Sequence, residues 1–202
     1  TNIEGVLDGL SWLKAVNLCK PAFPGNHVAV IGGGNAAMDT ARSALRLGAK
    51  TVTVIYRRSR EEMPAIAEEA EEAEKEGVKI LCRAMPKRFL TEGGKVMGIE
   101  CLKTGAGAPD ESGRPQPVPL PGSEFLLQAD TVLAAIGQQP DLSLLASDFQ
   151  LLPAGRSLAV NLQTLATEKE GVFAGGDLVH GTDIQPVSDH DTNSRGRTSA
   201  MC

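Results

Sequence analysis

The chain has 202 residues, 42% of them hydrophobic, and a formal net charge of −5. This composition is typical of a globular protein with a buried core, and the mild acidity excludes a broadly basic, nucleic-acid-binding surface. No apolar run is long enough to cross a membrane. The acidity is local, because eight glutamates and one lysine lie between Glu61 and Glu76.

The first 25 residues are predicted to form a connecting helix and a linker. Apolar residues recur at three- and four-residue steps over residues 4–18, a spacing typical of an amphipathic helix. Pro21, Pro24 and Gly25 end this helix and lead into an apolar strand, Val28 to Ile31. We expect the helix to be a structural connector.

A glycine-rich turn follows the first apolar strand. Gly32, Gly34 and Ala37 have the G-x-G-x-x-G/A spacing that opens a dinucleotide-binding helix. In this motif the first glycine allows the tight turn, the second lets the backbone approach a pyrophosphate, and the small third residue packs the helix against the strand. The motif alone is weak and also fits a glycine turn without a ligand. A flanking strand before it and a second strand after the helix, Thr51 to Ile55, favour nucleotide binding.

The next elements predict a Rossmann-like α/β domain over residues 26–145. A helix from Pro64 to Glu76, closed by Gly77, leads to a third strand over residues 78–81, so that the order implies a parallel sheet. A hairpin around residues 92–94 and a return strand over 123–128 predict a three-stranded antiparallel insert. The segment 105–122 holds five prolines and four glycines and is predicted to be a loop. Residues 131–136 return to the parallel sheet.

A change of composition after Asp141 suggests a second unit over residues 146–202. Residues 158–160 and 171–174 are short strand candidates. From about residue 183 the chain has few apolar residues, and we expect this tail to be disordered.

Arginines occupy the position that usually selects between NAD and NADP. In NAD-binding domains an acidic residue at the end of the second strand binds the ribose 2′-OH. Here the strand runs into Tyr56, followed by Arg57, Arg58, Ser59 and Arg60. Guanidinium groups bind a 2′-phosphate that a carboxylate would repel. The cluster therefore favours NADP(H), and the alternative is a basic surface turn beside the glutamates.

Four segments in this order resemble one enzyme family. They are Val28–Asp39, Tyr56–Pro64, Ala135–Pro140 and Gly171–Asp177. Together they resemble the NADPH-dependent glutamate synthase small (beta) subunit and its relatives, flavoproteins related to the pyridine nucleotide–disulfide oxidoreductases. The resemblance implies an electron-transfer flavoprotein in which NADPH passes hydride to FAD, and electrons continue to an iron–sulfur domain or a large partner subunit. Residues 146–202 then correspond to the C-terminal part of the FAD-binding domain.

The resemblance implies a set of cofactor-binding residues. For NADPH, the arginines at 57 and 58 would hold the 2′-phosphate, and the residues after the last parallel strand would form the crossing to the FAD domain. For FAD, Asp177 would meet the ribityl–pyrophosphate region, although it also fits a simple turn residue. The full set is Gly32, Gly33, Gly34, Asn35, Ala36, Ala37, Arg57, Arg58, Ala135, Ile136, Gly137, Gly176 and Asp177.

The sequence lacks several features of this flavoprotein family, and their absence leaves alternative functions open. The four cysteines, Cys19, Cys82, Cys101 and Cys202, form no C-x-x-C pair, so we expect reduced thiols in a cytoplasmic protein and neither a metal site nor a redox dithiol. No catalytic side chain is predicted, because hydride transfer depends mainly on cofactor positioning. The family's first glycine fingerprint for FAD has no counterpart, so the isolated chain is expected to be inactive and not to retain FAD. The alternatives are a non-catalytic NADP(H)-binding module and a module that docks a partner through its acidic helix.

Overall fold

The computed structural model describes residues 3–20, 22–110, 114–137, 149 and 157–180. The chain divides into two compact units, residues 1–138 and 139–202. The predicted boundary near residue 145 and the predicted disordered tail lie outside the described residues. Among the helices that are described, none has the length and apolar character needed to cross a membrane.

The first unit is built on a five-stranded parallel sheet with the order β1-β9-β2-β3-β4. Its strands are β1 (Val6–Asp8), β2 (His27–Ile31), β3 (Thr51–Ile55), β4 (Lys79–Leu81) and β9 (Thr131–Ala134). The helices of this unit are α1 (Gly9–Asn17), α2 (Asn35–Arg46) and α3 (Ala67–Glu76). The predicted Rossmann-like α/β fold is confirmed.

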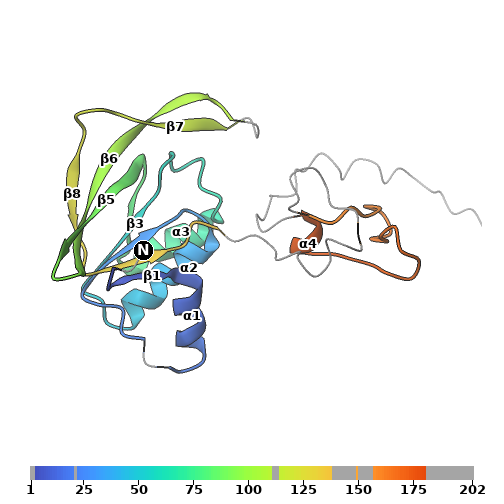
Figure 1. Ribbon diagram of the computed structural model, residues 1–202, viewed down its shortest axis with the longest axis horizontal. Coiled ribbons are helices and arrows are strands. Elements are labelled where there is room, and N and C mark those ends of the chain that lie inside the picture. The colour runs from blue at the N-terminus through green and yellow to red at the C-terminus, as the bar shows by residue number, and fades with distance from the viewer. Residues whose placement is uncertain (1–2, 21, 111–113, 138–148, 150–156, 181–202) are drawn as a thin grey trace, which may run out of the picture. The chain divides into compact units, whose positions relative to one another are not determined.

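The two faces of the parallel sheet carry separate hydrophobic cores. Side chains alternate between faces along a strand, so Val28 and Val30 point to one face and Ala29 to the other. Val28 and Val30 pack with Trp12 of α1 and with residues of α2 and α3. Ala29 packs instead with residues of the antiparallel strands, such as Ile99. The unit therefore has three layers, with the helices on one face of the parallel sheet and the antiparallel strands on the other (Figure 1).

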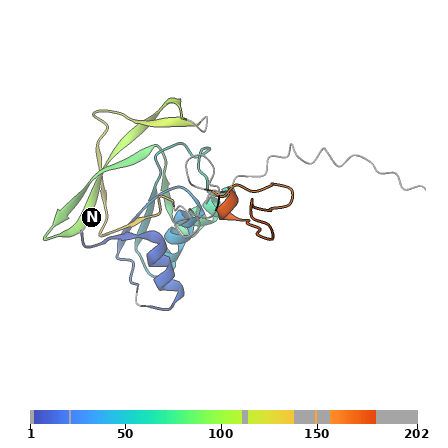
Figure 2. The same cartoon turned by 45° about the vertical axis from the view of Figure 1, so that its right-hand side comes forward.

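The antiparallel insert has four strands, where three were predicted. They are β5 (Ala84–Glu92), β6 (Lys95–Pro109), β7 (Pro115–Pro119) and β8 (Phe125–Gln128). The long central strand β6 pairs with β5, β7 and β8, and these strands form the green to yellow sheet of Figure 2.

The predicted loop over residues 105–122 is wrong, because β6 continues to Pro109 and returns as β7. The proline content suggested a loop, since proline cannot donate a ladder hydrogen bond. In β7 the prolines stand at every second position and the strand pairs only with β6. An edge strand tolerates proline in this way.

The helix predicted over residues 4–18 is also wrong in its first part. Val6–Asp8 is a strand that pairs in parallel with β9, and the helix begins only at Gly9. The Asp8 carboxylate caps the helix by accepting the Ser11 N–H at 2.8 Å. The N-terminal segment is therefore part of the sheet as well as a connector.

The helix α3 begins at Ala67, three residues after the predicted start at Pro64. Its predicted end is confirmed, because Gly77 adopts the left-handed conformation with φ 107°. Gly77 donates its N–H to the end of the helix, as a C-terminal glycine does.

In the second unit the predicted strands are reduced to isolated contacts. Ala166 and Phe173 form one antiparallel bridge, and the Leu158 N–H donates to the Leu178 carbonyl at 2.7 Å. A short helix, α4 (Asp177–His180), follows. Leu158 and Val179 are the buried hydrophobic residues of this unit among those described.

Candidate nucleotide-binding site

The first two glycines after β2 are required by the protein itself. Gly32 has φ 148°, and a Cβ added there would lie 2.2 Å from the Ala135 carbonyl oxygen. A Cβ at Gly33 would lie 2.3 Å from the ring of Tyr56. Both positions therefore need glycine for the tight strand-to-helix turn, whether or not a ligand binds.

Gly34 differs, because nothing in the described part of the chain explains its missing side chain. Its φ of −93° and ψ of 179° are open to any residue, and the nearest atom to an added Cβ is 3.9 Å away, on Pro64. Gly34 is the N-cap of α2 and offers no side-chain cap. The first-turn N–H groups at Asn35 and Ala36 have no acceptor within the helix and carry the positive end of its dipole. Open space at this point suits a phosphate group.

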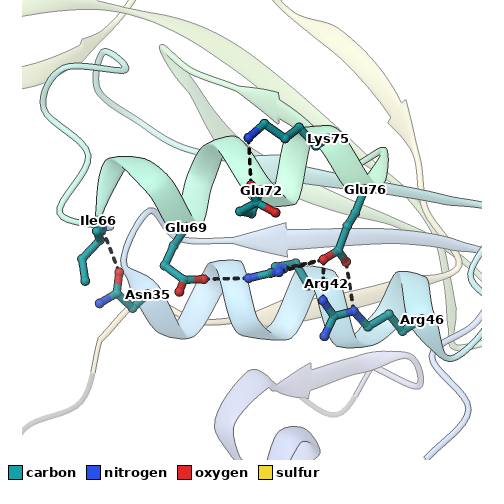
Figure 3. A network of polar contacts seen from close by, with 8 residues as sticks. All are labelled: Asn35, Arg42, Arg46, Ile66, Glu69, Glu72, Lys75 and Glu76. Carbon is teal, nitrogen blue, oxygen red and sulfur yellow. Dashed lines mark hydrogen bonds and ion pairs between the residues drawn. The ribbon is translucent and has the colours of Figure 1, made fainter.

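The loop after β3 is fastened to this glycine turn. The Asn35 Oδ1 accepts the Ile66 N–H at 2.9 Å, a contact drawn at the start of α2 in Figure 3. The Ala65 N–H donates to the Gly33 carbonyl at 3.0 Å. The loop therefore forms one side of the opening above Gly34.

The arginines of this loop have three different environments. Arg57 is exposed and makes no ion pair among the described residues. Arg58 is only 7% exposed and pairs with Asp110 at 2.5 Å, while its Nε has no hydrogen-bond partner. Arg60 pairs with Glu74 of α3 at 2.8 Å. Of the two arginines predicted to hold a phosphate, Arg57 is therefore presented to solvent and Arg58 is largely engaged.

Both arginines line a small recess between this loop and the β6–β7 hairpin. The recess is lined by Arg57, Arg58, Ser59, Glu62, Arg83, Thr104, Gly105, Ala106, Pro115 and Pro117. Sequence reasoning missed Arg83 and Thr104. A signal existed for Arg83, since it stands two residues after the end of β4, as Arg57 does after β3.

One carboxylate, that of Glu62, faces the arginines in the recess. Its Oε2 accepts the Ser59 N–H at 3.1 Å, and chiefly this hydrogen bond holds the pKa of Glu62 below its usual range. The loop is also fixed by the Tyr56 hydroxyl, which donates to the Glu62 carbonyl at 2.7 Å. At neutral pH the recess lining thus carries three positive charges and one negative charge.

The segment after β9, which was predicted to form the crossing to the FAD domain, lies beside the glycine turn. The Ala135 N–H donates to the Ile31 carbonyl at 2.8 Å, and the Ala135 carbonyl lies against Gly32. Ile136 is 77% exposed and Gly137 has φ 98°. The structure therefore brings residues 32–37, the two arginines and residues 135–137 to the carboxyl end of one parallel sheet. Gly176 and Asp177 belong to the second unit, where Asp177 begins α4.

The acidic helix α3 is partly neutralised by α2. Arg42 pairs with Glu69 at 2.7 Å and with Glu76 at 2.8 Å, and Arg46 also binds Glu76 (Figure 3). The hydrogen bonds from Arg46 and Arg42 hold the pKa of Glu76 below its usual range. This network fixes α3 against α2.

The described cysteines are all free thiols. Cys19 is exposed and Cys101 is buried, and burial raises the pKa of the Cys101 thiol to about 11. In the described part of the chain, no group of three or more His, Cys, Asp or Glu side chains is arranged to hold a metal ion.

Comparisons with known proteins agree with this geometry. The family model of the pyridine nucleotide-disulphide oxidoreductases matches residues 1–195. The NADP(+)-dependent formate dehydrogenase subunit beta of Moorella thermoacetica is 49% identical over 178 residues, which are 88% of this chain and 25% of that protein. The NADPH glutamate synthase small chain of Azospirillum brasilense is 41% identical over 162 residues, 79% of this chain and 33% of that protein.

A solved structure shows the same fold. Mycobacterium tuberculosis FprA in complex with NADPH superposes with a TM-score of 0.65 at 14% identity, over 89% of this chain and 54% of that one. The chain thus spans between a quarter and a third of the length of the two curated relatives above. The resemblance to the glutamate synthase small subunit and its relatives is confirmed, and the chain belongs to the pyridine nucleotide–disulphide oxidoreductase family.

Proposed function

We propose that this chain is the NADPH-binding part of a larger flavin-dependent oxidoreductase of the glutamate synthase small-subunit type. The observation that carries the proposal is the open space at Gly34. It lies at the positive end of α2, beside a loop that presents Arg57. The two relatives named above act with NADP(+) or NADPH according to their names.

The pyrophosphate of the nucleotide fits the turn between β2 and α2. Gly34 leaves room for a phosphate oxygen where a side chain would stand, and the N–H groups at Asn35 and Ala36 point to it. The small Ala37 is fully buried and packs α2 closely on the sheet, which holds this helix end in place. These contacts do not distinguish NADPH from NADH, because both cofactors carry the pyrophosphate.

The preference for NADPH is assigned to the loop after β3. A 2′-phosphate at the end of β3 would meet the exposed Arg57 guanidinium, and no carboxylate occupies the position where NAD-binding domains place one. Arg58 is proposed to act indirectly, because its guanidinium group is paired with Asp110 and so ties the loop to the residue after β6. The role of Arg58 is thus proposed to be mainly to shape the loop.

The chemistry is proposed to need the rest of the protein. When bound, NADPH supplies a hydride, which we propose is accepted by FAD in the full-length protein before electrons pass to an iron–sulfur domain or partner subunit. Residues Ala135 to Gly137, after β9, would lie at the nicotinamide end, and Gly176 and Asp177 would contribute to the FAD side. The exposed Ile136 offers an apolar surface that excludes water from a bound nicotinamide.

Titration with both cofactors tests the proposal. The full chain is titrated with NADPH and NADH by calorimetry at fixed salt, as wild type and as Arg57→Ala. Losing one charge-assisted contact at an exposed site should weaken NADPH binding about 10-fold. NADH binding should hardly change.

A matched control is Arg88→Ala, which removes an exposed arginine of β5 that pairs with Glu100. This control should bind both cofactors as the wild type does. Equal losses for NADPH and NADH in Arg57→Ala would mean that the arginine supports the fold or the pyrophosphate. If the wild-type chain binds neither cofactor, the proposed function is wrong.

A further inference from the structure

We propose that Arg83 is a further binding residue for the 2′-phosphate and that Thr104 positions it. This inference rests on the proposed function and deepens it. Neither residue belongs to the segments that identified the site from sequence.

The first argument is the register of the parallel sheet. The strands β2, β3 and β4 are neighbours, with Ile31 paired to Ile55 and Ile55 paired to Leu81. Two residues beyond these paired positions stand Gly33, Arg57 and Arg83. Neighbouring strands lie about 4.8 Å apart, so Arg83 follows its strand where Arg57 follows the adjacent one. The edge that carries the pyrophosphate turn and Arg57 therefore continues to Arg83.

The second argument is the conformation of Arg83. Its φ is 52°, in the left-handed region, which a residue with a Cβ adopts only where its surroundings hold it. Two backbone hydrogen bonds hold it. Its N–H donates to the Arg58 carbonyl at 2.8 Å, and its carbonyl accepts the Thr104 N–H at 2.9 Å. This turn places the exposed Arg83 side chain on the same recess as Arg57.

The third argument is that one threonine fixes both arginine segments. While the Thr104 N–H binds Arg83, the Thr104 hydroxyl donates to the Arg57 carbonyl at 2.6 Å. Thr104 is 3% exposed, so the hydroxyl has little access to water. The backbone segments that carry the two guanidinium groups are therefore both held by the insert strand β6.

The fourth argument is the balance of charge. Asp110 engages Arg58, which leaves Arg57 and Arg83 as the exposed guanidinium groups of the recess. Glu62 contributes one negative charge, and Arg83 lowers the pKa of this carboxylate as a more distant charge. Two arginines facing one space match the oxygen atoms of a phosphate dianion, which each guanidinium binds through paired N–H groups.

The experiment isolates the 2′-phosphate from the rest of the cofactor. Adenosine 2′,5′-bisphosphate and AMP are titrated into the full chain by calorimetry, followed by NADPH and NADH. The variants are Arg83→Gln, Thr104→Val and Thr104→Ser. The controls are Arg88→Gln on β5 and Thr131→Val. Thr131 is a buried threonine like Thr104, but it lies in β9.

Arg83→Gln should weaken binding of the bisphosphate and of NADPH about 3- to 10-fold, with AMP and NADH unchanged. It should also flatten the salt dependence of NADPH binding, because one phosphate contact is lost. Thr104→Val should reduce the preference for NADPH in the same direction, and Thr104→Ser, which keeps the hydroxyl, should restore it. The controls should bind as the wild type does.

The outcomes separate this inference from the function on which it rests. If Arg57→Ala loses NADPH selectively and Arg83→Gln does not, Arg83 is a surface arginine and only this inference is wrong. Equal losses of NADPH and NADH in Arg83→Gln would also overturn this inference alone, because the residue would then act on the fold. If the wild type binds none of the four probes, the proposed function and this inference fail together. If Thr104→Val does not fold, the Arg83→Gln variant alone tests the inference. The Arg83 side chain is exposed, so its replacement should not prevent folding.

Discussion

The substitution Gly34→Ala tests whether this glycine is required by the fold or by a bound ligand. Three glycines follow β2, and in the structure the first two have no room for a Cβ. At Gly34 the nearest atom is 3.9 Å from an added Cβ, and the backbone conformation is ordinary. Gly34→Ala is therefore expected to fold and to bind the nucleotide more weakly.

The expected change in stability is small because two effects oppose each other. Replacing glycine by alanine at a compatible position stabilises a protein by about 0.4–1 kcal/mol, through the unfolded chain. Alanine is a poorer N-cap than glycine, which costs up to about 1 kcal/mol. The free energy of unfolding should then stay within about 1 kcal/mol of the wild type.

The expected change in binding is larger. A methyl group in the open space keeps the phosphate from the N–H groups at the start of α2, and a hydrogen bond to a charged group contributes roughly 1.5–3 kcal/mol. Losing one such contact weakens binding at least about 10-fold. NADPH and NADH should lose equally, because the pyrophosphate is common to both.

Urea denaturation and calorimetric titration of Gly34→Ala measure the two quantities. The comparison variant is Gly32→Ala, whose Cβ would lie 2.2 Å from the Ala135 carbonyl oxygen at a φ of 148°. It should be destabilised by about 3 kcal/mol or more, or not fold. A Gly34→Ala chain that binds both cofactors as the wild type does would refute the assignment of this space to a phosphate. A large loss of stability in that variant would refute the account of the glycine turn.

Two further expectations follow from titratable groups. The pKa of Glu76 is held below its ordinary value of about 4.5, so its stabilising effect is complete above that pH and is lost as the pH falls through the lowered pKa. The difference in urea midpoint between wild type and Glu76→Gln should thus shrink from neutral pH to about pH 3, and a difference independent of pH would contradict the ion-pair assignment. Cys101 is buried with a thiol pKa of about 11, whereas Cys19 is exposed. Iodoacetamide at neutral pH should alkylate Cys19 in the folded chain and spare Cys101, as peptide mass spectrometry would show; equal labelling would mean that the β6 core opens.

The structural elements that depend on local sequence were predicted correctly. The glycine turn between β2 and α2 is one, because the strand, the glycines and the helix follow one another within a few residues. Gly77 as the end of α3 is another, because a left-handed helix end depends on the residue itself. Elements that depend on distant partners were missed. Val6–Asp8 is a strand only because residues 132–134 pair with it.

The arginine cluster shows the same division at the level of single side chains. The sequence places Arg57 and Arg58 after β3 but does not reveal which of them faces inward. In the structure Arg58 is the buried one, held by Asp110, a residue 52 positions further along the chain. Arg57 and Arg58 lie in a bend after β3, where no strand periodicity indicates which side chain turns inward. Arg83 carried a local signal, but its contact with Thr104 of another sheet could not be read from the neighbouring residues.

The insert sheet therefore has two roles that arise from one strand. The first part of β6 buries Val96, Ile99 and Cys101 against the parallel sheet and closes the second hydrophobic core. Parallel strands of three to five residues end at the binding edge, but β6 is 15 residues long and continues. Its far part delivers Thr104 to the two arginine segments, and Asp110 follows directly to pair with Arg58. A strand that ended with the core would complete the fold and leave the arginine loop without these contacts. The extra length of β6 thus places Thr104 and Asp110 where they bind the arginine segments.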